Sequence, residues 1–331
     1  MGDVAMTVPV LRALVAQHPN VRVTVISRTF FKPFFDGIPN LDFFAFDAKE
    51  KHKGILGLLQ LYWDLKPLSI DAFADLHNVL RAKVIRNRFA LSGKKVAATD
   101  KGRAEKRQLT RLEKKTIEPL PTMFERHAKT LEALGYPVNL SNPTFPPKQN
   151  MEAAVTNLTS EKNTQTWIGI APFAQYHSKV YPLDLMLEVI RQLIQNKKNK
   201  IFLFGGGHEE IEQLNALSEH HQNTIVIAGK LKFNQELQLI SNLDVMLSMD
   251  SGNAHIAAMY GVKTITLWGA THPFAGFTPF NQPIENAIVS DRNQYPFLPT
   301  SVYGNKKVVG YENAMRTILP QTVVGKIRGI L

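Results

Sequence analysis

The feature that most constrains this chain is the stretch from Asp244 to Trp268, in which two apolar runs flank a tight turn and a short helical segment. The first run, residues 245–249, is apolar apart from one serine, which is typical of a strand buried on both faces of a parallel sheet. The helical segment ends at Gly261, and the second run follows at once. A strand–helix–strand unit of this kind predicts an α/β fold with a parallel sheet.

The turn in this stretch, Asp250-Ser251-Gly252, is a candidate anion site. A helix that begins here presents backbone N–H groups and the positive end of its dipole, and ligands of open α/β sheets bind outside the carboxyl ends of strands. An ordinary helix cap is an equally open interpretation, because Asp and Ser are the commonest capping residues. His255, one turn further along the same helix face, favours a functional site.

Strand–helix alternation extends along the rest of the chain and predicts two doubly wound, Rossmann-like domains, the first apparently without its first strand. A passage rich in proline and asparagine, residues 137–147, predicts a linker. We expect an N-terminal domain over residues 1–155, a second domain over 165–311, and a C-terminal helical segment, 312–331, that packs back towards the N-terminal domain. Helices are expected at 4–18, 55–65, 79–90, 123–134, 183–196, 209–219 and 233–242, and strands at 21–27, 42–46, 69–75, 94–98, 167–171, 200–204, 224–228, 245–249 and 262–268.

The positive charge of the chain is concentrated in one segment. The net charge is +11, and residues 81–115 alone hold 13 Lys and Arg against three acids. Such a segment indicates a polyanionic partner, which could be nucleic acid, an anionic membrane surface or a phosphorylated substrate, although a solvated helical face is also open. Residues 101–115 lack an apolar stripe, so we expect a mobile surface loop or an exposed helix there rather than core.

The amino-acid composition limits the cellular compartment that we expect and the kinds of catalytic and metal site that the chain can form. The chain has no cysteine, which excludes disulfides, thiolate metal sites and a cysteine nucleophile. No apolar run approaches the roughly 20 residues that span a bilayer, and no signal-peptide pattern opens the chain, so we expect a cytoplasmic protein. His255 and His272 show no metal-ligand spacing with other histidines or acids, and no structural metal is expected.

Three further loops follow expected strands. Gly206 lies in a glycine turn that allows a ligand close to the backbone, and Glu209 or Glu210 could accept a hydrogen bond from a ribose hydroxyl. This turn lacks the dinucleotide spacing, no Walker motif is present, and a simple tight turn is equally open. Lys179, before a helix that starts at Pro182, could neutralise a phosphate, although a lone loop lysine is more often simply solvated. Thr271 and His272 either line a pocket or form a rigid turn.

Several of these pieces occur together in an order that resembles one family. They are Gly2-Asp3-Val4-Ala-Met-Thr-Val-Pro9, Lys179-Val-Tyr-Pro182, the glycine turn before Glu209-Glu210, Asp250-Ser251-Gly252-Asn-Ala-His255 and Trp268-Gly-Ala-Thr-His-Pro273. Over essentially its whole length the chain resembles glycosyltransferase family 9, the ADP-heptose:lipopolysaccharide heptosyltransferases. The resemblance implies a GT-B fold, with two Rossmann-like domains facing across a cleft. It also implies inverting transfer of heptose from ADP-heptose to the lipid A–linked inner core, with no cofactor.

The resemblance also implies roles for individual residues. Asp3 corresponds to the general base that takes the acceptor hydroxyl proton, and Lys179 to the residue that stabilises the leaving diphosphate. The basic part of the first half would receive the phosphorylated lipid A–linked acceptor, through Asn78, Arg81, Arg103 and Arg107, in peripheral contact with the inner face of the inner membrane. The donor would be bound by Gly206, Glu209, Glu210, Asp250, Ser251, Gly252, Asn253, His255 and Thr271.

Two other functions remain open from the sequence. One is a GT-B transferase or epimerase that uses another nucleotide sugar, because donor choice depends on pocket shape. The other is a non-catalytic polyanion-binding protein that uses residues 81–115. That segment contains one aromatic residue, Phe89, and no recognised nucleic-acid module, which disfavours readout by base stacking.

Overall fold

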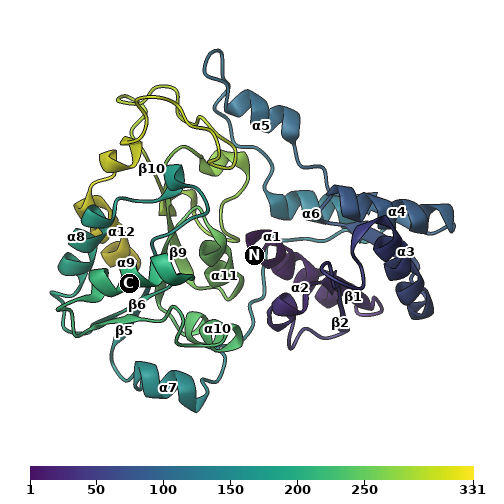
Figure 1. Ribbon diagram of the computed structural model, residues 1–331, viewed down its shortest axis with the longest axis horizontal. Coiled ribbons are helices and arrows are strands. Elements are labelled where there is room, and N and C mark those ends of the chain that lie inside the picture. The colour runs from purple at the N-terminus through teal and green to yellow at the C-terminus, as the bar shows by residue number, and fades with distance from the viewer. The chain divides into compact units, whose positions relative to one another are not determined.

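The computed structural model describes residues 1–331, which form two compact units. One unit comprises residue 1, Asp3–Arg103 and Pro121–Thr144, and the other comprises residue 2, Ala104–Leu120 and Phe145–Leu331. The junction after Thr144 lies within the proline-rich passage at 137–147. Each unit alternates helices with parallel strands, which confirms the α/β class (Figure 1).

The second unit contains a six-stranded sheet in the order β10-β9-β8-β5-β6-β7, and all neighbouring strands are parallel. From β5 the chain adds strands outward on one side and then returns to add β8, β9 and β10 on the other. The direction therefore reverses between β5 and β8, which creates a topological switch point. The strands are β5 (Thr166–Ala171), β6 (Asn199–Leu203), β7 (Thr224–Val226), β8 (Val245–Met249), β9 (Lys263–Trp268) and β10 (Ala287–Val289).

Helices cover both faces of this sheet, as right-handed crossovers in opposite directions require. The strand β8 is fully buried along its length, which explains why its sequence is apolar apart from Ser248. The helices of the unit are α7 (Ala153–Thr159), α8 (Leu183–Leu193), α9 (His208–Ser218), α10 (Phe233–Ser241), α11 (Gly252–Met259) and α12 (Pro320–Ile330), with short 3-10 turns η3 (His177–Lys179), η4 (Pro273–Ala275), η5 (Ile284–Asn286) and η6 (Ala314–Thr317).

The C-terminal helix differs from the sequence-based expectation. We expected residues 312–331 to pack back towards the N-terminal domain, but α12 packs against α8 and contacts β8 and β9 in the second unit. Its buried side chains, Val323, Val324 and Ile327, belong to the same core cluster as the central strands. Because these three residues follow a helical spacing, their apolar stripe closes the open face of that sheet.

The first unit contains two separate parallel pairs, β1 with β2 and β3 with β4. Its core cluster joins the inner faces of α3 and α4 to these strands, with Leu58, Leu61, Leu65, Ile85 and Phe89 at its centre. The elements are α1 (Gly2–Ala5), α2 (Thr7–Gln17), β1 (Val23–Ser27), η1 (Thr29–Phe34), β2 (Leu41–Ala45), α3 (Gly54–Leu65), η2 (Lys66–Leu68), β3 (Ala72–Asp75), α4 (Leu80–Leu91), β4 (Lys95–Ala98) and α6 (Met123–Glu132).

The basic segment does not belong to one unit, contrary to expectation. Residues 81–103 lie in the first unit, but α5 (Arg103–Leu109) continues into a stretch that packs on the second. Lys106 and Leu109 are buried, and the Lys106 ammonium lies 3.9 Å from the centre of the Phe277 ring. The backbone N–H of Leu120 donates to the carbonyl of Phe274 at 3.0 Å. The exposed helix, one of the two expected forms, is therefore present as α5, but Lys106 and Leu109 are packed on its inner side.

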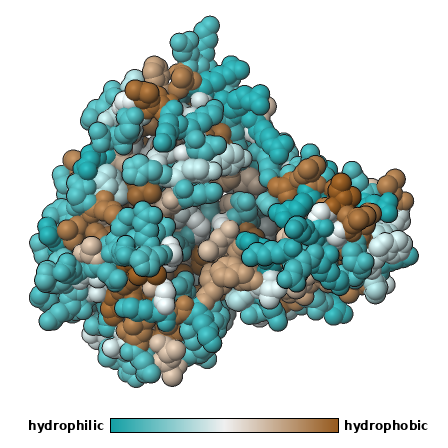
Figure 2. All heavy atoms as spheres, viewed as in Figure 1, coloured by the Kyte–Doolittle hydropathy of each residue, from teal (hydrophilic) through white to brown (hydrophobic).

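No helix combines the length and the apolar character that a membrane crossing needs. In the space-filling view, hydrophobic side chains nevertheless gather over the part of the molecule formed by α3 and α4 (Figure 2). The residues with large exposed apolar side chains are Ile55, Leu56 and Trp63 of α3, Leu68 of η2, and Leu80 and Leu91 of α4.

Candidate active site

The candidate site in the second unit lies at the carboxyl ends of β5, β8 and β9, which are adjacent strands. One side chain comes from the loop after each strand: Lys179 after β5, Asp250 after β8 and Thr271 after β9. The Lys179 Nζ lies 3.0 Å from Asp250 Oδ2, and the Thr271 hydroxyl donates to the same oxygen at 2.9 Å. The structure thus brings together three predicted site residues that are up to 92 positions apart in sequence.

This cluster is largely shielded from solvent. The side chains of Lys179 and Asp250 are 12% and 9% exposed, and Thr271 is buried. A buried ion pair persists only when its geometry and remaining hydrogen bonds are good, and here Asp250 receives both a cation and a hydroxyl donor. Because an ammonium group has three donors, Lys179 can hold Asp250 and still donate to an anionic ligand.

The α11 helix begins beside this cluster. Ser251 is its N-cap residue, but the serine side chain makes no capping hydrogen bond, and its Oγ instead lies 3.1 Å from Ser248 Oγ. Ser251 therefore occupies the N-cap position without the side-chain hydrogen bond of an ordinary capping serine. The start of α11, with Gly252 and Asn253, has the dipole and backbone donors that suit a phosphate group. His255 is buried one turn further along the helix.

Two features that the sequence did not single out position Lys179. Gly304 has a positive φ of 86°, and a Cβ built there would come within 2.6 Å of the Lys179 side chain. Ser178 fixes this approach, because its Oγ donates to the Gly304 carbonyl at 2.7 Å. Gly269 allows the loops after β5 and β9 to touch, since a Cβ there would lie 2.3 Å from the Ser178 carbonyl oxygen. Only the three-dimensional contact reveals these roles.

The two candidate acids that follow the glycine turn after β6 lie in different environments. Glu210 Oε2 accepts from the Gly206 backbone N–H at 2.8 Å, which is the tight-turn arrangement. Glu209 is exposed at the first turn of α9. Of the two acids, Glu209 is therefore the better placed to accept from a ligand hydroxyl.

His272 supports a rigid turn rather than a titrating site. Its Nδ1 accepts from the Phe274 backbone N–H at 3.1 Å and so caps the short turn η4. Burial, together with the nearby cations Arg292 and Lys115, lowers the pKa of His272 to about 4. The imidazole is neutral at physiological pH, as its acceptor role requires.

In the first unit, Asp3 lies in α1, and its side chain is 70% exposed. His77 Nε2 lies 3.7 Å from Asp3 Oδ2, so a histidine accompanies the predicted base. Burial lowers the pKa of His77, and the negative charge of Asp3 opposes that shift. Burial likewise lowers the pKa of Lys101, with Asp3 again acting in the opposite direction. His77 was present in the sequence beside Asn78, but no motif distinguished it.

The predicted acceptor residues fall into different environments. Asn78 has a structural role, because its side-chain amide donates to the Thr99 carbonyl at 2.9 Å and its backbone N–H donates to Asp75. Arg81 is exposed, with its guanidinium 5.8 Å from the centre of the Phe46 ring. Arg103 and Arg107 are both exposed on α5, but Arg103 belongs to the first unit and Arg107 to the second.

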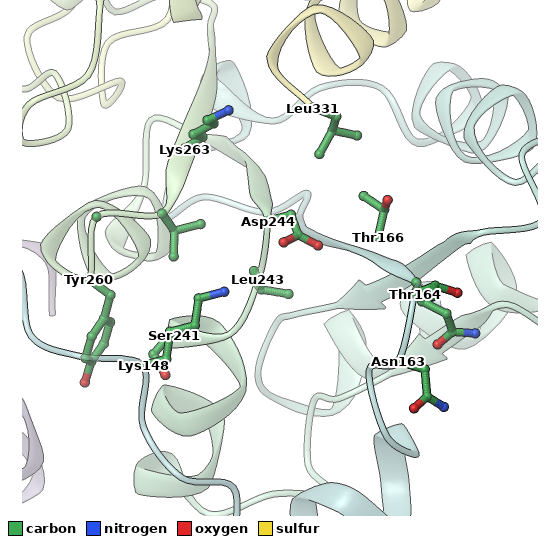
Figure 3. Close-up of a pocket in the computed structure, with 13 residues that line it drawn as sticks. Lys148, Asn163, Thr164, Thr166, Ser241, Leu243, Asp244, Tyr260, Lys263 and Leu331 are labelled. Atoms are coloured by element: carbon green, nitrogen blue, oxygen red, sulfur yellow. The ribbon is translucent and has the colours of Figure 1, made fainter.

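A pocket of about 510 Å³ lies at the opposite, amino-terminal edge of the six-stranded sheet (Figure 3). Asp244 faces it, and accepts from Lys162 Nζ at 2.7 Å and from the Trp167 backbone N–H at 2.8 Å. None of the predicted site residues lines this pocket. The pocket is therefore separate from the carboxyl-edge cluster.

Comparisons with known proteins show which family and which fold the chain resembles. The chain is 24% identical to the lipopolysaccharide core heptosyltransferase OpsX of Haemophilus influenzae over 99% of this chain and 93% of the relative. It is 23% identical to lipopolysaccharide heptosyltransferase 2 of Escherichia coli, over 100% and 96% of the two chains. Among solved structures it resembles E. coli ADP-heptose lps heptosyltransferase II, with a TM-score of 0.68, 20% identity and coverage of 99% and 95%. The family 9 glycosyltransferase of Veillonella parvula gives a TM-score of 0.74, with 19% identity and coverage of 99% and 94%.

The fold is that of the GT-B class of glycosyltransferases. The family model described as glycosyltransferase family 9 (heptosyltransferase) matches residues 59–307. The chain belongs to that family, as its motifs predicted.

Proposed function

We propose that this enzyme transfers heptose from ADP-heptose to the lipid A–linked inner core of lipopolysaccharide, with inversion at the anomeric carbon. The observation that carries the proposal is the cluster of Lys179, Asp250 and Thr271 at the switch point, beside the start of α11. Family membership supports the class of reaction, and the names of the relatives, which are lipopolysaccharide heptosyltransferases, support the sugar and the acceptor.

On the donor side, the backbone N–H groups at the start of α11 bind the diphosphate. As the bond between the anomeric carbon and the phosphate oxygen breaks, negative charge grows on the leaving ADP. Lys179 stabilises that charge, and its pairing with Asp250 holds the ammonium in position beforehand. Glu209 accepts from a ribose hydroxyl, and His255 supports the first turn of α11.

On the acceptor side, Asp3 takes the proton of the attacking hydroxyl, so that the sugar oxygen becomes a nucleophile as it approaches the anomeric carbon. Arg81, Arg103 and Arg107 provide positive charge for a phosphorylated acceptor. The reaction yields the extended acceptor and ADP, and the proton remains on the carboxyl group of Asp3 until solvent removes it.

The proposal includes no metal and no cofactor, because a lysine and a helix N-terminus provide the charge stabilisation that a metal ion provides elsewhere. It places the enzyme in the cytoplasm, at the inner face of the inner membrane where the lipid-linked acceptor is exposed. Transfer that persists undiminished in excess EDTA is the expected result. Loss of transfer with EDTA and its recovery with a divalent cation would show that the reaction needs a metal ion, contrary to the proposal.

The substitution Asp3→Asn tests the base. Transfer should be abolished while the shift in melting temperature caused by ADP-heptose persists, because the donor residues are untouched. Full turnover by the variant would reject Asp3 as the base. A parallel screen of wild-type protein with UDP-sugars and GDP-sugars separates the alternatives, since stabilisation by a UDP-sugar alone points to another transferase or to an epimerase.

A further inference from the structure

The α3 helix is apolar on both sides, which is unusual for a helix at a protein surface. Its sequence, Gly-Ile-Leu-Gly-Leu-Leu-Gln-Leu-Tyr-Trp-Asp-Leu, contains one charged residue, Asp64. One stripe, formed by Gly57, Leu58, Leu61 and Leu65, is buried in the core of the first unit. A helix that is apolar all round needs a second apolar environment on its other side.

The outer side of α3 carries a continuous apolar strip. At about 100° per residue, Ile55, Leu59, Trp63 and Leu56 fall within an arc of roughly 100° on the side away from the core. Ile55 is 72% exposed, Leu56 81% and Trp63 53%, and Leu68 of the following turn η2 is also exposed. The only acid of the helix points elsewhere, because Asp64 pairs with His52 at 2.9 Å and with Lys51 at 2.7 Å.

Lysines flank this strip at both ends. Lys49 and Lys53 precede α3 and Lys66 follows it, and all three are exposed. The Lys66 ammonium lies 5.0 Å from the centre of the Trp63 ring. An exposed tryptophan with lysines beside an apolar strip is the arrangement of helices that lie in the interface of an anionic membrane. The 12 residues of α3 are about 18 Å long, shorter than the roughly 30 Å hydrocarbon core, so the helix would lie in the plane.

We propose that the α3 strip, defined as Ile55, Leu56, Leu59, Trp63 and Leu68, inserts into the surface of a bilayer containing anionic phospholipid, with Lys49, Lys53 and Lys66 at the headgroups. This deepens the membrane contact in the proposed function and places it on α3 instead of on the basic segment 81–115. It does not depend on glycosyl transfer, because lipid binding and transfer are measured separately. Exposed acids, Asp47 and Glu50, also precede α3. A bilayer is favoured over a protein partner because the strip carries an exposed tryptophan and has exposed lysines at both ends, as interfacial helices do.

The tryptophans of the chain give a direct reporter. The chain has three, and Trp167 and Trp268 are buried, whereas Trp63 is exposed. With vesicles of phosphatidylglycerol and phosphatidylcholine, the emission should shift to the blue and become protected from aqueous iodide. Vesicles of phosphatidylcholine alone should give a much weaker change. The Trp63→Phe variant should still sediment with the vesicles but lose the spectral shift.

The Ile55→Gln/Leu56→Gln variant removes apolar contact and leaves the Trp63 reporter in place. Partitioning to the anionic vesicles should fall at least about tenfold, since burial of one such side chain contributes about that factor. Lys49→Gln/Lys53→Gln/Lys66→Gln should weaken binding and reduce its salt dependence. The matched control Val309→Gln/Leu319→Gln removes two exposed apolar side chains of the second unit and should bind like wild type.

Three outcomes would overturn the proposal. The first is unchanged partitioning of the Ile55→Gln/Leu56→Gln variant together with loss of binding in Arg81→Gln/Arg103→Gln/Arg107→Gln. The second is the absence of any Trp63 shift with anionic vesicles. The third is lipid-free self-association of the wild type that the Ile55→Gln/Leu56→Gln substitutions abolish, which would assign the strip to a second copy of the chain. Circular dichroism of each variant checks that it is folded.

Discussion

At the residue scale, the central element is the shared oxygen of Asp250. It holds Lys179 from one loop and Thr271 from another, so a single carboxylate fixes a cation at the carboxyl edge of the sheet. The ion pair is shielded from water, so moving the lysine away would leave the Asp250 carboxylate buried without its cation, which costs free energy. A preorganised cation of this kind needs little rearrangement when charge develops on a leaving group.

The substitution Lys179→Ala should lower kcat by about 10²–10³-fold, as expected when a preorganised donor to a developing anion is lost. Donor affinity should also fall. Asp250 keeps its bond from Thr271, so the protein should still fold. Steady-state transfer kinetics and a donor thermal-shift titration measure both effects, with the exposed Lys198→Ala as the control. Turnover within threefold of wild type would contradict the role.

Two buried titratable groups should give opposite pH dependences of stability. The pKa of His272 is lowered from 6.5 in the unfolded chain to about 4 in the native state. Between these two pH values the unfolded chain binds the proton more strongly than the native state does. The free energy of unfolding therefore rises as the pH rises from about 4 to 6.5. Burial raises the pKa of Glu236 from 4.5 to about 7, so the native state keeps its proton longer and stability falls as pH rises through that window. Each contribution is at most about 3 kcal/mol.

Variants separate these two contributions. Asparagine can also cap a turn, so His272→Asn should keep the η4 turn while reducing the loss of stability between pH 6.5 and 4. Glu236→Gln should be more stable than wild type at pH 8 and indistinguishable at pH 4. Urea unfolding across pH 4–8 measures the free energies. Parallel profiles for wild type and both variants would show that neither group titrates as stated.

At the element scale, the loop around Gly304 determines whether Lys179 reaches its position. Gly304→Ala places a methyl group where the Lys179 side chain passes, at a backbone φ that favours glycine. Gly310 has a similar φ of 83° but open space around it, so Gly310→Ala is a matched control for backbone strain alone. We expect both variants to lose about 1 kcal/mol of stability, but only Gly304→Ala to lose at least about tenfold in transfer. Equal transfer rates of the two variants would show that Gly304 does not position Lys179.

The elements also show what a sequence can and cannot predict. The strands β8 and β9 were predicted to within a residue, because a fully buried parallel strand leaves a mainly apolar run. The loops after β5 and β9 were recognised by motif. The packing of α5 was not predicted. Lys106 is a charged residue, and the residue that it contacts, Phe277, lies far away in sequence. The role of Gly304 depends on a similar non-local contact with Lys179.

At the scale of the whole molecule, the sequence predicted two α/β units, but the basic segment is divided between them. Residues 81–103 belong to the first unit, and residues 104–115 lie in the part of α5 and the following loop that packs on the second. The net charge of the segment therefore does not describe one surface. The surface that we propose for lipid contact is instead the α3 strip, where apolar and basic side chains lie together.

The central claim is that this chain transfers a heptosyl group from an ADP-sugar. The most direct measurement incubates the purified protein with ADP-heptose and a lipid A–linked inner-core acceptor, and follows ADP release and the acceptor mass. We predict an acceptor heavier by one heptose and an equal amount of ADP, both lost in Asp3→Asn. An unmodified acceptor with ADP-heptose, together with a modified one when a UDP-sugar or GDP-sugar replaces it, would contradict the claim.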